Sequence, residues 1–133
     1  MTVTLLKSKI HRATVTGAIL DYEGSIGICP NLISQAGFLP WEKVDIYNVN
    51  TGARFSTYVI VGNVGEICLN GAAARLVQAG DLVIIAAYCQ LEAKAATTHV
   101  PTVVLVDAAN RVVPGGKILP QGGATRQLAG IPE

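Results

Sequence analysis

A serine hydroxyl directly after a glycine, in the pair Gly24-Ser25, is the group in this chain best suited to unusual chemistry. The hydroxyl can attack the preceding carbonyl carbon, which moves the acyl group from nitrogen to oxygen and turns the amide into an ester. This shift is uphill unless strain and hydrogen bonds favour it, and glycine, which has no Cβ, lets the hydroxyl approach. β-Elimination then breaks the ester, and water converts the resulting dehydroalanine to a pyruvoyl group with release of ammonia. The pair is common in proteins, so this interpretation depends on its surroundings.

Three further segments supply reactive side chains around this pair. They are Lys-x-His at 9–11, Arg-Phe-Ser-Thr-Tyr at 54–58 and Asn-Gly-Ala-Ala-Ala at 70–74, which accompany Tyr-Glu-Gly-Ser at 22–25. Together the four segments closely resemble the bacterial L-aspartate alpha-decarboxylases (aspartate 1-decarboxylases), over roughly residues 1–107. Members of that family cut their own backbone between such a glycine and serine.

The resemblance implies a covalent cofactor and a defined reaction. The cofactor is a pyruvoyl group made from Ser25, without a metal, and cleavage after Gly24 yields chains 1–24 and 25–133. The ketone would form a Schiff base with L-aspartate and act as an electron sink while carbon dioxide leaves. The product would be β-alanine, a precursor of pantothenate and coenzyme A.

Two residues are candidates for assisting the self-cleavage. The resemblance places Thr57 near the Gly24 carbonyl, where its hydroxyl would donate to the developing oxyanion. Asn70 is the second candidate, because its amide can orient the loop. Each has an ordinary alternative, since Thr57 suits any strand as a β-branched residue and Asn70 suits a helix N-cap.

The substrate chemistry calls for cations and a proton donor. Aspartate brings two carboxylates, so Arg54 is expected to bind one with its planar fork and Lys9 to hold the other as a point charge. Tyr58 is the expected proton donor after decarboxylation, because a phenol can give a proton in a dry pocket. The alternatives are solvated surface cations for Arg54 and Lys9 and a half-buried strand aromatic for Tyr58.

Five more residues complete the expected site. Gly71, Ala72 and Ala73 would leave room for the substrate and offer backbone N–H groups, and Thr57 is expected to contact the substrate as well. Tyr22 would line the site near the cut. The resemblance places His11 close by, although a structural histidine on an alternating strand is the plain alternative.

The chain departs from the family at four positions near these segments. Several members have a histidine just before the Tyr-Glu-Gly-Ser run, where this chain has Asp21. Ile19 replaces a frequent aspartate, and position 17 is Gly17. Tyr47 stands where some members carry tryptophan. These changes concern the rate of processing more than the reaction.

Composition bounds the class of protein. Hydrophobic residues make up 50% and charged residues 14% of the 133, against about 25% charged in an ordinary soluble domain. This deficit favours coverage of apolar surface by other subunits, and the resemblance implies a homotetramer. The net charge of +1 and the scattered basic residues argue against nucleic-acid binding.

Location and metal content follow from other features of the chain. No apolar run approaches the roughly 20 residues that span a bilayer, and no signal peptide is recognisable, so a cytoplasmic protein is expected. Three cysteines without Cys-x-x-Cys spacing argue against a disulfide framework and a thiolate zinc site. Only two histidines are present, which makes a histidine-rich metal centre improbable.

The elements that would position these residues are short strands separated by turns. Turn signals include Asn50-Thr51-Gly52, which predicts a hairpin, and Pro30 with Gly37, which predict the ends of a helical turn. The alanine-rich stretch 70–77 predicts a second helical turn. Strands are expected at 3–9, 11–16, 26–29, 43–49, 53–61, 66–69, 82–88 and 100–106.

Such a pattern predicts an all-β fold, either a barrel or a sandwich. The resemblance implies a small six-stranded double-psi β-barrel with short helices. One domain is expected over residues 1–113. Residues 114–133 are rich in glycine and proline and are expected to form a flexible tail.

Two alternatives to the aspartate decarboxylase remain. A pyruvoyl enzyme could act on another amino acid, although Arg54 and Lys9 favour a dicarboxylate. An uncleaved, non-catalytic β-barrel binding module would leave Ser25 intact. The sequence does not imply a maturation partner.

Overall fold

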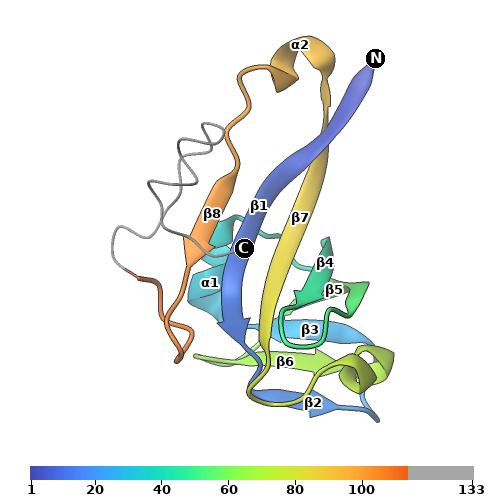
Figure 1. The fold of residues 1–133 in the computed structure, drawn as a ribbon, viewed down its shortest axis with the longest axis vertical. Coiled ribbons are helices and arrows are strands. Elements are labelled where there is room, and N and C mark those ends of the chain that lie inside the picture. The colour runs from blue at the N-terminus through green and yellow to red at the C-terminus, as the bar shows by residue number, and fades with distance from the viewer. Residues whose placement is uncertain (114–133) are drawn as a thin grey trace.

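The computed structural model describes residues 1–113, in which eight strands form one sheet (Figure 1). The predicted tail, residues 114–133, lies outside the described part. The strand order is β2-β6-β3-β5-β4-β7-β1-β8. The mainly-β prediction is therefore confirmed, and a single sheet of this kind is consistent with a small barrel. The strands are β1 (Thr2–Thr14), β2 (Gly17–Ile19), β3 (Ser25–Ile28), β4 (Lys43–Asn48), β5 (Arg54–Val61), β6 (Ile67–Asn70), β7 (Leu82–Glu92) and β8 (Thr102–Leu105).

Two long strands, β1 and β7, run antiparallel beside each other and dominate Figure 1. The sequence predicts two strands at 3–9 and 11–16, but one strand covers most of both ranges. The pairing shifts register between Ile10 and Ala13, and Arg12 within this interval has φ 60°. A β-bulge absorbs an irregular residue and bends a strand without ending it, which explains the continuity.

The predicted hairpin is confirmed as β4 and β5. Asn48 holds the turn, because its Oδ1 accepts hydrogen bonds from the N–H groups of Asn50 and Thr51. Gly52 takes φ 80°, a conformation that favours glycine. This turn sets the register that puts Arg54 opposite Tyr47.

Strand β3 lies between β5 and β6, and this placement organises the region around the Gly-Ser pair. It runs antiparallel to β6, where Ser25 faces Asn70, and parallel to β5, where Ile26 pairs with Val59. All four residues of β3 and all four of β6 are buried. Such strands on the inside of a fold are well suited to hold a polar site rigidly.

The helices are short. Helix α1 (Pro30–Ala36) starts at a proline and ends at Gly37 with φ 71°, as predicted, and buries Leu32 and Ala36 against the sheet. The predicted turn at 70–77 is a 3-10 helix, η1 (Gly71–Leu76). Helix α2 (Ala93–Ala96) follows β7. Within residues 1–113 the structure contains no helix of the length and apolarity needed to cross a membrane.

The core consists mainly of branched aliphatic side chains from the sheet. Strand β7, predicted at 82–88, is buried on both faces from Val83 to Ala87, whereas Tyr88 is 42% exposed. The largest fully buried side chains are those of Ile10, Ile26, Ile28, Leu32, Ile46, Ile67, Leu69 and Ile85.

Candidate functional site

Ser25 lies at the first position of β3 and is buried, with 1% of its surface exposed. Its Oγ accepts a hydrogen bond of 2.9 Å from Nδ2 of Asn70. The hydroxyl itself donates to the backbone carbonyl of Glu23, at 3.4 Å. The serine hydroxyl is therefore held in a fixed, dry position next to the Gly24 peptide.

Asn70 precedes η1 in the position of a helix N-cap, but its side chain makes no capping hydrogen bond. The amide instead spans from β6 to Ser25. Asn70 is therefore the N-cap residue by position, but its side chain bonds Ser25 instead of capping the helix.

Gly71 brings the backbone of η1 into close contact with the predicted cut. It has φ 68°, and a Cβ at this position would lie 2.7 Å from both Cα and N of Gly24. The same Cβ would lie 3.0 Å from the carbonyl oxygen of Tyr22. Real Cβ atoms do not approach backbone this closely, so only glycine fits here. The sequence predicts that Gly71 leaves room for the substrate, whereas in the structure Gly71 lies directly against Gly24.

Cys68 is a member of this cluster that sequence reasoning missed. Its thiol lies 3.4 Å from Oδ1 of Asn70, and both side chains are buried. Burial, and then the negative charge of Glu66, raise the pKa of the Cys68 thiol. The sequence does carry a signal for Cys68. It lies two positions before Asn70 on the same strand, so the two side chains point to the same face.

Thr57 and Tyr58 lie on β5, next to β3. Extending the parallel register of Ile26 and Val59 toward the N-terminus brings Tyr58 alongside Ser25 and Thr57 alongside Gly24. Neighbouring strands are about 4.8 Å apart, so such an extended register would put both residues near Gly24 and Ser25. The Tyr58 ring packs against Trp41, with centroids 5.9 Å apart.

The two expected cations line a depression of about 540 Å³ that is formed by residues of β1, β4, β5 and β7. The guanidinium of Arg54 lies 3.9 Å from the centre of the Tyr47 ring, and the Tyr47 and Tyr88 hydroxyls are 2.6 Å apart. Burial, followed by the hydrogen bond with Tyr88, raises the pKa of Tyr47 strongly. The depression is lined by Leu6, Lys9, Tyr47, Asn48, Val49, Arg54, Ile84, Ala86 and Tyr88.

Within one chain, the predicted site residues therefore fall into two groups. The cleavage cluster comprises five predicted residues, Tyr22, Gly24, Ser25, Asn70 and Gly71, together with Cys68, and the contacts above join them. The cation depression contains Lys9 and Arg54 but none of the cleavage cluster.

The remaining predicted residues have varied surroundings. His11 is buried on β1, where it pairs with Leu105 of β8. Tyr22, although it belongs to the cleavage cluster, is 54% exposed. Ala72 is exposed on η1, whereas Ala73 is partly buried and packs against the core.

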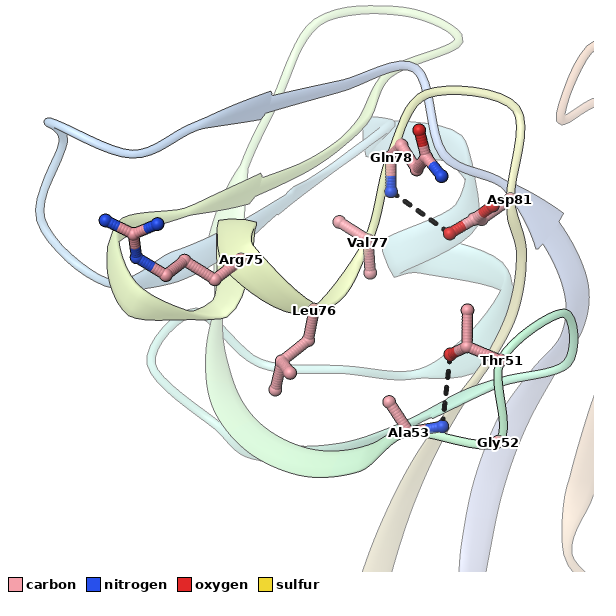
Figure 2. A pocket seen from close by; sticks show the side chains of 8 residues that line it. All are labelled: Thr51, Gly52, Ala53, Arg75, Leu76, Val77, Gln78 and Asp81. Atoms are coloured by element: carbon pink, nitrogen blue, oxygen red, sulfur yellow. Dashed lines mark hydrogen bonds between the residues drawn. The ribbon is translucent and has the colours of Figure 1, made fainter.

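A second depression, of about 550 Å³, lies between the β4–β5 turn and the end of η1 (Figure 2). It contains no predicted site residue. Its carboxylate, on Asp81, accepts hydrogen bonds from the Gln78 N–H and from Asn48 Nδ2. This arrangement closes a turn and is structural. Among the described residues, no three His, Cys, Asp or Glu side chains are arranged to hold a metal.

The fold and the cleavage cluster define an all-β protein in which a buried serine, preceded by glycine, opens an internal strand. Comparison with known proteins agrees with this class. The aspartate decarboxylase family model matches residues 1–113, and the chain belongs to this family.

Named relatives support the family over most of the chain. The chain is 66% identical over 112 residues to aspartate 1-decarboxylase of Bdellovibrio bacteriovorus, covering 84% of this chain and 90% of the relative. It is 57% identical to the enzyme of that name from Caldicellulosiruptor saccharolyticus, covering 85% and 90%. The enzyme of that name from Campylobacter hominis is 55% identical, with 85% and 99% covered.

Proposed function

We propose that this chain cleaves itself between Gly24 and Ser25 and then converts L-aspartate to β-alanine and carbon dioxide. Its membership of the aspartate decarboxylase family supports the reaction. The observation that carries the proposal is the cleavage cluster, in which Asn70 holds the Ser25 hydroxyl while Gly71 packs against Gly24.

The residues around the cut suit the formation of a pyruvoyl group. Oγ of Ser25 attacks the carbonyl carbon of Gly24, and the peptide C–N bond breaks to leave an ester and a free amine. Elimination then breaks the Cβ–Oγ bond and releases Gly24 as a carboxylate. Addition of water releases ammonia and leaves a ketone at position 25, so atoms balance with one water consumed.

Three side chains near Ser25 have roles in this scheme. Asn70 donates to the serine side of the reacting peptide. We assign Thr57 to the Gly24 carbonyl as an oxyanion donor, supported by the extended register of β3 and β5. Tyr58, alongside Ser25 in the same register, is assigned as the proton donor to the carbon that loses carbon dioxide.

The pyruvoyl ketone supplies an electron sink for the decarboxylation. The chain itself must bind the two substrate carboxylates and exclude water. Arg54 suits this task because its guanidinium is fixed against the Tyr47 ring, and Lys9 lines the same depression. Lys9 and Arg54 line a depression that contains none of the cleavage cluster, which supports a substrate site completed by a second subunit.

We therefore propose that the active form is a homotetramer in which one subunit presents its cation depression to the cleavage cluster of another. The low charge content supports coverage of surface by further subunits. Exposed apolar side chains support it as well, including Ile19 and Leu20 near the cut and Leu39 and Trp41 before β4.

The mass of the purified chain tests the proposed processing directly. Two fragments, of residues 1–24 and 25–133, are expected, and Ser25→Ala should remain full-length and inactive. A wild-type chain that stays intact after prolonged warming would contradict self-cleavage and favour a binding module. Carbon dioxide release from Ser25→Ala would contradict the pyruvoyl mechanism.

Turnover on several amino acids tests the proposed substrate. L-Aspartate should be decarboxylated much faster than arginine, because the depression holds two cations, which suit two carboxylates and repel a guanidinium. Turnover on glutamate then measures how strictly the site reads side-chain length. Carbon dioxide release from arginine alone would overturn the substrate assignment.

A further inference from the structure

The cleavage cluster contains a third side chain in line with Ser25 and Asn70. On β6, Cys68 and Asn70 are two residues apart, and the strand pairs them with Gly27 and Ser25 of β3. The thiol lies 3.4 Å from Oδ1 of Asn70, and Nδ2 of Asn70 lies 2.9 Å from Oγ of Ser25. Thiol, amide and hydroxyl therefore form one buried chain of hydrogen bonds.

The orientation of the Asn70 amide decides whether the Ser25 hydroxyl faces the NH₂ group or the oxygen of that amide. An asparagine amide has an acceptor end and a donor end of nearly equal shape, so its hydrogen-bond partners select between two orientations. A protonated thiol donates, which favours Oδ1 on the Cys68 side and directs the NH₂ group to Ser25. The Ser25 hydroxyl then keeps its own proton for the Glu23 carbonyl.

This selection matters for the reaction. When Oγ loses its proton to become the nucleophile, negative charge develops on this oxygen, and the Asn70 NH₂ group that faces it stabilises that charge. The opposite amide orientation would present the Oδ1 lone pairs of Asn70 to the same region, which would repel the charge. The side chain that fixes the amide thus affects the rate without touching the reacting atoms.

We propose that Cys68 is a positioning residue for self-cleavage, whose thiol holds the Asn70 amide with its NH₂ group toward Ser25. The inference rests on the proposed self-processing. The raised pKa of the thiol is consistent with it, because a protonated thiol remains available as a donor. Gly17 of β2 pairs with Cys68, and a Cβ there would lie 3.6 Å from Sγ, so the thiol is enclosed on this side too.

The test is the self-cleavage rate of full-length variants. Each chain is made by cell-free synthesis, and the loss of intact mass is followed over time. Cys68→Ala removes the donor and should slow cleavage about tenfold, the usual effect of one neutral hydrogen bond. Cys68→Ser keeps a donor at this position and should restore a rate close to that of the wild type.

A second buried thiol provides the matched control. Cys29, before α1, is also free and buried, but it belongs to the hydrophobic core and not to the cleavage cluster, so Cys29→Ala should leave the rate unchanged. Thermal unfolding of each variant reports folding. If Cys68→Ala does not fold, Cys68→Val, which fills the space without a donor, takes its place.

The outcomes separate this inference from the proposed function. Wild-type speed in Cys68→Ala, or equal slowing in Cys68→Ser and Cys68→Ala, would overturn the positioning role while leaving self-cleavage intact. A wild-type chain that never cleaves would overturn the proposed function itself.

Discussion

At the residue scale, chemistry could be predicted from side-chain type, but orientation could not. The sequence identifies Ser25 and Asn70 as partners because a hydroxyl and an amide suit the cut. It does not reveal the contact of Cys68 with Asn70, since a cysteine among apolar residues is usually interpreted as an ordinary core residue. Gly71 was predicted as space for substrate, whereas its contact with Gly24 depends on how β6 turns into η1.

Replacing Gly71 with alanine tests this contact. Gly71→Ala should remain uncut and unfold at a lower temperature, because the new Cβ would collide with Gly24 and positive φ costs about 1–2 kcal/mol for a non-glycine residue. Intact mass and thermal unfolding measure the two effects. Gly65→Ala is the control, since Gly65 has φ 79° but no atom within 4 Å of the added Cβ. Equal processing in both variants would show that the close approach is unimportant.

Arg54 gives the second prediction at this scale. Arg54→Lys should raise KM for aspartate by about tenfold or more, because lysine loses both the bidentate fork and the stacking on Tyr47. Steady-state kinetics of the cleaved variant provide the measurement. Arg111→Lys, at an exposed ion pair with Asp107, should leave KM unchanged. An unaltered KM in Arg54→Lys would remove Arg54 from substrate binding.

At the element scale, local signals were the reliable ones. The hairpin of β4 and β5 and the ends of α1 follow from Gly52, Pro30 and Gly37, whose backbone preferences act within a few residues. The continuity of β1 through Arg12 could not be predicted from the sequence, since a β-bulge depends on the pairing with the partner strand. The position of β3 between β5 and β6 is also non-local. This order brings Asn70 to Ser25 and places β5, which carries Thr57 and Tyr58, beside β3.

Asn48 is the residue on which the β4–β5 turn depends. Its Nδ2 donates to the Leu76 carbonyl and to Asp81, while its Oδ1 accepts from the turn backbone. Asn48→Ala should lower the free energy of unfolding by about 2–3 kcal/mol, because buried polar partners lose their bonds. Denaturant titration measures this loss, and Asn63→Ala, at an exposed position, is the control. A change below about 0.5 kcal/mol, typical of surface substitutions, would contradict the role.

At the scale of the whole molecule, the division into two groups of site residues is the main finding. Composition indicated contact between subunits, but only the structure shows that Lys9 and Arg54 line a depression apart from Ser25. No sequence pattern reports this separation, because all these residues lie on strands of the same sheet. In the homotetramer that we propose, contact between subunits would therefore serve catalysis as well as stability.

Mixed oligomers provide the test of a shared site. Ser25→Ala lacks the reactive serine and Arg54→Ala lacks a substrate cation, so each variant alone should be nearly inactive. If a site takes Ser25 from one subunit and Arg54 from another, co-expression should restore activity. Random assembly of equal amounts gives about one competent site in four, because two independent choices must both be correct.

The measurement is the specific activity of oligomers that carry two different affinity tags and are purified through both. Activity near a quarter of the wild-type value supports sites formed between subunits. The control is to express the two variants separately and mix them without exchange of subunits, and this mixture should show no activity. Mixed oligomers that form, process their Arg54→Ala chains and still fail to decarboxylate aspartate would place Ser25 and Arg54 in the same subunit's site. The cation depression would then have to reach the cleavage cluster by a rearrangement within one chain, which the rigid pairing of β3, β5 and β4 disfavours.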